Sequence, residues 1–233
     1  MTENAMIYVL TLLLAAACGL LASVCLSPER LRTVRLLRPK DEETEVFHKM
    51  EDRTRRIASG VIGLIAALAA WRMFCLTEQT VDRVRFALAL LCLTGSGCAD
   101  WTEHRIPNIF PLTLTLGALC ALAWECILAP ELASVRLINC LIAGGVSLLC
   151  LVLLSLLSQH GVGAGDIKLV SALGLLMGIR PLYWTVLLTM VLCAAGAAYL
   201  LITKKKTLKQ AVAFGPFVLA GYCLAWICGL LAG

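Results

Sequence analysis

Long apolar stretches, separated by short polar segments, run through most of the 233-residue chain. Their apolar residues are consecutive rather than alternating, and most stretches approach the roughly 20 residues that a helix needs to cross a bilayer. Since backbone groups in lipid must be hydrogen-bonded internally, consecutive apolar runs of this kind predict spanning helices. We therefore expect eight spans, at residues 6–26, 57–76, 84–99, 109–128, 137–157, 167–180, 182–203 and 211–231.

The sixth predicted span, 167–180, is short. At about 1.5 Å of rise per residue it would extend about 21 Å, less than the roughly 30 Å of the hydrocarbon core. A helix of this length could be re-entrant, or it could face a water-filled hollow or a locally thinned bilayer.

Composition supports this interpretation. Hydrophobic residues make up 60% of the chain and charged residues 15%, with a mean hydropathy of +0.88. In soluble domains, about half of the residues are hydrophobic and about a quarter are charged. We expect an all-α integral membrane protein of the inner or plasma membrane, with about eight transmembrane helices. The first helix and a basic loop would form residues 1–56, and the polytopic core would form residues 57–233.

The basic residues predict the orientation of the chain. Nine Lys and Arg residues lie in the segment 27–56, and cytoplasmic loops carry an excess of such residues. If this segment is cytoplasmic and lies near anionic headgroups, alternation of the spans places six further basic residues inside and four outside. Both termini would then lie outside. Topology thereby explains the net charge of +5, and we expect no nucleic-acid partner.

Neither the cysteines nor the histidines follow a metal-binding pattern. The twelve cysteines lie mostly inside apolar runs, and no C-x-x-C pair occurs. They are typical of small buried hydrophobic residues. The three histidines, His48, His104 and His160, are scattered in predicted cytoplasmic loops, and no H-E-x-x-H motif occurs. We expect no metal site and no cofactor.

Acidic residues are rare beyond residue 57, and the predicted topology separates them. Four fall toward the outer surface: Glu78, Asp82, Glu125 and Glu131. Three fall at the cytoplasmic ends of spans: Asp100, Glu103 and Asp166. Because ionisable groups at membrane depth are costly, these three are functional candidates.

Asp100 ends the third predicted span and Asp166 precedes the sixth, so both can reach the same membrane surface. Two carboxyls suffice for peptide hydrolysis, because an ionised one takes a proton from water and a protonated one donates to the scissile carbonyl. Close like charges make such a pair share a proton and separate their pKa values. A structural role is the alternative for Asp166, since an aspartate just ahead of a helix can cap it.

Two rival functions are open at this point. Ser96 and His160 could supply a serine nucleophile and its base, but the G-x-S-x-G pattern is absent. Gly95 and Gly97 are more typical of close helix packing. A small transporter or an assembly scaffold is the non-enzymatic alternative. A transport path should continue polar through the bilayer, whereas the outer halves of these spans read as apolar.

Three segments resemble the signature motifs of the type IV prepilin peptidases, which are GxGD-type aspartyl proteases. The resemblance covers roughly residues 84–231. The three segments are Asp100-x-x-x-x-x-Ile106-Pro107-Asn108, Gly163-x-Gly165-Asp166-x-Lys168 and Phe214-Gly215-Pro216.

This resemblance implies a pack of membrane helices with both aspartates near the cytosolic surface. It implies that Asp100 and Asp166 are the catalytic pair, and that the other motif residues support them. The implied substrates are type IV prepilins or pseudopilins, cleaved next to the glycine that ends their short basic leader. The alternative of a scaffold or small transporter for a pilus or secretion assembly would involve the same partners without cleavage.

The chain departs from many bacterial members of that family in its first cytoplasmic loop. Those members also N-methylate the new N-terminus, and this loop usually carries a metal-binding cysteine tetrad. The segment 27–56 has no cysteine, so we expect a peptidase without methyltransferase activity. The presenilin-like proteases share G-x-G-D but place tyrosine before the first aspartate, whereas Ala99 precedes Asp100 here.

Overall fold

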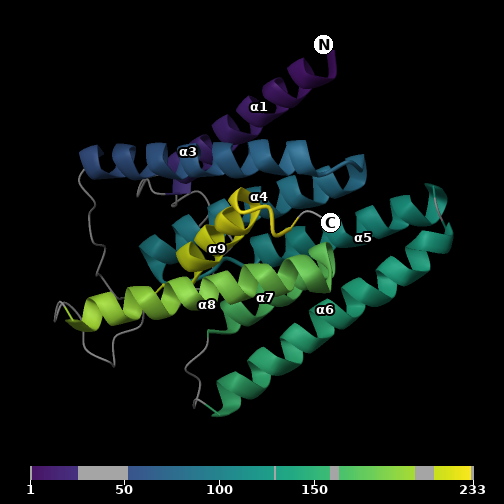
Figure 1. The fold of residues 1–233 in the computed structure, drawn as a ribbon. Helices are drawn as coiled ribbons and strands as arrows, with labels where there is room; N and C mark the ends of the chain where they lie inside the picture. The colour runs from purple at the N-terminus through teal and green to yellow at the C-terminus, as the bar shows by residue number, and fades with distance from the viewer. Residues whose placement is uncertain (1, 26–51, 129, 158–162, 203–212, 232–233) are drawn as a thin grey trace.

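The computed structural model describes residues 2–25, 52–128, 130–157, 163–202 and 213–231. Each predicted span coincides with one helix in these ranges, which confirms the all-α architecture (Figure 1). The helices described are α1 (Thr2–Cys25), α3 (Asp52–Leu76), α4 (Thr80–Glu103), α5 (Ile109–Leu128), α6 (Pro130–Leu157), α7 (Ala164–Met177), α8 (Ile179–Ile202) and α9 (Gly215–Ile227).

Five helices, α1, α3, α5, α6 and α8, are long and apolar enough to cross a membrane. They expose many large hydrophobic side chains, among them Leu116, Leu153 and Val191. Side chains of this kind are costly in water and suit a lipid environment. The chain is therefore a multi-pass membrane protein.

The other three helices, α4, α7 and α9, contribute most of the buried core. The helix α9 packs against α4 and α8, and α7 packs against α5 and α6 (Figure 1). Tyr222 and Trp226 of α9 are buried, and the Tyr222 hydroxyl donates a hydrogen bond of 2.7 Å to the carbonyl of Phe86 on α4. Because protein covers these helices, α7 and α9 can be shorter than the lipid-facing ones, and α4 can be more polar.

Two helix ends differ from the sequence prediction in a way that matters for the site. The helix α4 continues four residues beyond predicted residue 99, because no glycine or proline interrupts it before His104, whose φ of 50° ends it. The helix α7 begins at Ala164 instead of residue 167. Both candidate aspartates therefore lie inside terminal helical turns rather than beside them.

The starts of two further helices also differ from the sequence prediction, and each has a proline in its first turn. The helix α6 starts at Pro130 instead of residue 137, since proline fits the first turn of a helix. The helix α9 starts at Gly215 instead of residue 211, with Pro216 in its first turn. Most of the basic segment 27–56, together with His48 and His160, lies outside the described residues. The division at residue 56 and the placement of the termini stay predictions.

Candidate active site

Asp100 lies in the last turn of α4 and is only 6% exposed. Its carboxylate Oδ2 accepts a hydrogen bond of 2.7 Å from the backbone N–H of Gly215. Gly215 is the first residue of α9. The bond therefore joins a carboxylate to a helix N-terminus, where N–H groups without helical partners carry partial positive charge.

No side chain fits at Gly215. A Cβ atom there would lie 2.9 Å from the Cβ of Asp100 and 3.1 Å from the Cα of Gly97, well inside the roughly 3.5–4.0 Å of an optimal carbon contact. A Cβ at Gly97 would in turn lie 3.3 Å from the carbonyl oxygen of Gly215. The helices α4 and α9 thus approach backbone to backbone here, which confirms the packing role expected for Gly97.

Asp166 is the third residue of α7, whose N-cap is Gly163. The Asp166 N–H donates to the Gly163 carbonyl at 3.1 Å, and the Gly163 backbone lowers the pKa of the Asp166 carboxyl. A carboxyl at the third helical position beside the N-cap backbone is the arrangement of a capping box. A carboxylate offers about four lone-pair sites, so a contribution to capping leaves room for a second role.

The first two motifs lie against each other. A Cβ at Gly165 would be 3.1 Å from the Cβ of Ile106, so the start of α7 packs directly on the connection between α4 and α5. Lys168 Nζ donates a hydrogen bond of 3.4 Å to Asn108 Oδ1 across the same contact. These contacts bring the segment that follows Asp100 against the segment that contains Asp166.

The two carboxyls, which lie just outside the predicted spans 84–99 and 167–180, influence each other electrostatically. Burial raises the pKa of Asp100 above its ordinary value, although the Gly215 hydrogen bond partly opposes this. Burial and then the charge of Asp100 raise the pKa of Asp166 to about 6. The second effect requires the two groups to be close enough for their charges to interact. The two carboxyls are therefore candidates for a common site.

The remaining motif residues frame this site. Phe214 is the N-cap of α9, and Pro216 lies in its first turn. A backbone N–H at that position would have no partner within the helix, so the lack of one in proline costs no hydrogen bond. Pro107 lies before α5, and its carbonyl accepts a hydrogen bond of 3.3 Å from the Phe110 N–H. The structure thus brings together three motifs that lie at residues 100–108, 163–168 and 214–216 of the sequence.

The described residues offer no support for a serine nucleophile. Ser96 is buried, and its Oγ donates a hydrogen bond of 3.2 Å to the Leu93 carbonyl of the same helix. The Ser96 hydroxyl is therefore occupied within its own helix.

Sequence reasoning missed a second polar region, at the opposite end of α4. Arg85 and Glu125 are 4% and 8% exposed and form an ion pair of 2.7 Å. The expectation that the outer halves of the spans are apolar is wrong here. The argument against a transporter, which depended on that expectation, therefore no longer applies. The available signal was the pair of opposite charges, each near the outer end of a predicted span.

Comparisons with known proteins agree with the motifs. The model of the type IV leader peptidase family matches residues 86–201. The prepilin leader peptidase/N-methyltransferase of Bacillus subtilis (strain 168) is 29% identical over 107 residues, covering 43% of this chain and 43% of that protein. The match thus spans less than half the length of this curated relative. No solved structure matches the chain. The family match includes the first two motifs and ends before the third.

Proposed function

Because residues 86–201 belong to the type IV leader peptidase family, we propose that the chain is a membrane-embedded aspartyl endopeptidase. It removes the leader peptide of type IV prepilin-like or pseudopilin substrates at the cytoplasmic membrane face. The observation that carries the proposal is the packing of the first turn of α7, which contains Asp166, against the segment that follows Asp100, where Gly165 meets Ile106.

The reaction needs one ionised and one protonated carboxyl. The ionised aspartate takes a proton from a water molecule, whose oxygen attacks the carbonyl carbon of the scissile bond. The protonated aspartate donates its proton to the carbonyl oxygen. When the tetrahedral intermediate collapses, the C–N bond breaks and one carboxyl gives its proton to the leaving amine. The other carboxylate takes a proton from a hydroxyl group of the intermediate, so the pair returns to its starting state. The pair titrates as a unit, so we assign base and acid to the pair and not to single residues.

The hydrogen bond from Gly215 supports this chemistry by orienting Asp100. One carboxylate oxygen is held by the backbone of α9, which fixes the orientation of the carboxyl group. A carboxylate held in this way loses little freedom when the transition state forms. The contacts of Ile106 with Gly165 and of Asn108 with Lys168 support the pair less directly, by holding α7 against α4.

The cytoplasmic location rests on the distribution of basic residues. The segment 27–56 carries nine of them and precedes α3, so the C-terminal end of α4, where Asp100 lies, returns to the same membrane surface. We propose further that the chain lacks the N-methyltransferase activity included in its relative's name, since the segment 27–56 contains no cysteine.

Substitution of each aspartate tests the proposal. Asp100→Asn and Asp166→Asn are expected to abolish leader removal from a co-expressed prepilin in membranes, because each removes a titrating group. Glu103→Gln is the matched control, as it neutralises an acid at the same end of α4 outside the proposed pair, and it should cleave normally. Full cleavage by either aspartate variant would refute the pair.

The non-catalytic alternative, a scaffold or small transporter of a pilus or secretion assembly, regains weight from the buried charges near Glu125. The same experiment separates it from the peptidase. Stable capture of the prepilin by the unaltered chain, without any shortening of the prepilin, would favour the scaffold. Cleavage that depends on both aspartates would exclude it as the sole function.

A further inference from the structure

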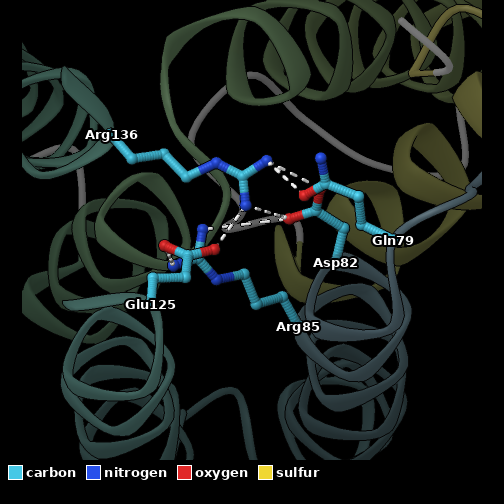
Figure 2. Close-up of polar contacts among 5 residues, drawn as sticks. All are labelled: Gln79, Asp82, Arg85, Glu125 and Arg136. Carbon is cyan, nitrogen blue, oxygen red and sulfur yellow. Dashed lines mark hydrogen bonds and ion pairs between the residues drawn. The ribbon is translucent and has the colours of Figure 1, made fainter. Parts of the chain in front are cut away.

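Four charged side chains from three helices meet at the end of α4 that lies opposite Asp100. Arg136 of α6 donates to both oxygens of Asp82 on α4, at 2.8 and 2.9 Å, and also to Glu125 of α5 (Figure 2). Arg85 of α4 donates to the other Glu125 oxygen at 2.7 Å. The Arg85 and Asp100 positions are separated by about 22 Å along the helix, at about 1.5 Å per residue. This group is therefore distinct from the proposed active site.

A cavity of about 540 Å³ adjoins this group. Its polar lining includes three guanidinium groups, from Arg85, Arg136 and Arg180, and two carboxylates, from Glu78 and Asp82. Volumes of roughly 300–1,000 Å³ are typical of sites that take small molecules. The cavity lies where α3 ends and where α4 and α8 begin. In a multi-pass protein, such helix ends lie near the level of the lipid headgroups.

Arg85 has hydrogen-bonding capacity that the described residues leave unused. Only 4% of the residue is exposed, and its Nε has no hydrogen-bond partner. Its Nη1 lies 4.0 Å from Asp82 Oδ1, an ion-pair contact longer than a hydrogen bond, and its Nη2 donates to Glu125. A guanidinium whose fork is partly free is well suited to phosphate, which it can bind through two parallel N–H groups.

The charges around the cavity restrict the chemical class of ligand that it can bind. The lining groups sum to one net positive charge, and Glu125, which contacts two of the three arginines, brings the set to neutrality. A free anion would meet two or three carboxylates in such a site. A headgroup that carries both a phosphate and an ammonium group matches both signs. Apolar walls from Leu76 and Phe86 suit the start of its acyl chains.

We propose that this cavity binds the headgroup of a zwitterionic phospholipid at the membrane surface opposite the two aspartates. The phosphate lies against Arg85 and the ammonium group lies against the carboxylates of the lining. The proposal is independent of the peptidase function, because it involves neither the aspartate pair nor its substrate.

Lipid retention by the unaltered protein is the first test. The full chain is purified in detergent and offered phosphatidylethanolamine, phosphatidylglycerol and a glycolipid without phosphate, all with identical acyl chains, and bound lipid is measured by native mass spectrometry. Preferential retention of phosphatidylethanolamine is expected. Equal or greater retention of either other lipid would overturn the assignment. If the protein bound inorganic phosphate but retained no lipid, free phosphate would be the ligand and the lipid proposal would be overturned.

Arg85→Lys is the second test, with Arg83→Lys as its matched control. Lysine keeps a positive charge for Glu125 but loses the additional N–H donors, so affinity for phosphatidylethanolamine should fall at least about tenfold, the effect of one lost charge-assisted hydrogen bond. Arg83 lies on the same turn of α4 outside the cavity lining, and its variant should bind normally. Unchanged retention by folded Arg85→Lys would overturn the proposal.

Discussion

Gly215→Ala offers the sharpest test of how the backbone of α9 orients Asp100. The added Cβ would lie 2.9 Å from the Cβ of Asp100. An optimal carbon contact is about 3.5–4.0 Å, so the two helices must separate by about 0.6–1.1 Å, or Asp100 must rotate away. Both changes act on the same hydrogen bond. Its present length is 2.7 Å, and it would lengthen beyond the roughly 3.2 Å limit of a good N–H···O bond.

The expected loss follows from the energy of that bond. A hydrogen bond to a charged group contributes about 1.5–3 kcal/mol. If the bond acts mainly by holding Asp100 in its reactive orientation, the cleavage rate should fall about 10- to 150-fold, at about 1.36 kcal/mol per factor of ten. The loss should appear in kcat more than in KM, because the orientation matters most in the transition state.

The assay is leader cleavage by purified protein in detergent, normalised to the folded fraction from thermal unfolding. Gly145→Ala on α6 is the matched control, since a Cβ there has nothing within 4 Å. Alanine in a helix is about 1 kcal/mol more favourable than glycine, so the control should be as stable or more stable and fully active. Cleavage by Gly215→Ala at the rate of the unaltered chain would refute an orienting role for α9.

Three further predictions concern pH, a peripheral contact and the distal charges. The pKa of Asp166 is raised to about 6, so this carboxyl keeps its proton to a higher pH than an ordinary aspartate does. The cleavage rate should therefore fall as the pH rises through about 6. A pH–rate profile that already falls near pH 4 would contradict this. Lys168→Ala should lower the rate less than about fivefold, because its 3.4 Å hydrogen bond is exposed; a complete loss in the cleavage assay would show a direct role. Glu125→Gln should destabilise the fold by about 3–5 kcal/mol, because it leaves two guanidinium groups poorly paired. Glu131→Gln, at an exposed position, should leave the stability unchanged. Equal thermal unfolding temperatures for the two variants would contradict this reasoning.

Local chemistry was sufficient to predict the helices and the candidate aspartates. A run of apolar residues predicts a span wherever it occurs, because the cost of exposing backbone groups to lipid depends on the segment itself. The rarity of acids in the core reduced the candidates to Asp100, Glu103 and Asp166 for the same reason, and the resemblance to the prepilin peptidase motifs selected the two aspartates. The helix ends were less predictable, since α4 continues into the polar residues that follow its apolar part.

Only the tertiary structure decided which distant residues meet. Asp100 and Gly215 are 115 positions apart, and their hydrogen bond exists because Gly97 and Gly215 let two helices touch. The pairing of Arg85 with Glu125 depends in the same way on which faces of α4 and α5 pack together. The sequence by itself therefore determined the membrane-spanning helices and the residues able to carry the chemistry. Their arrangement into an aspartate site and a separate charged cavity came from helix packing, which depends on contacts between segments far apart in the chain.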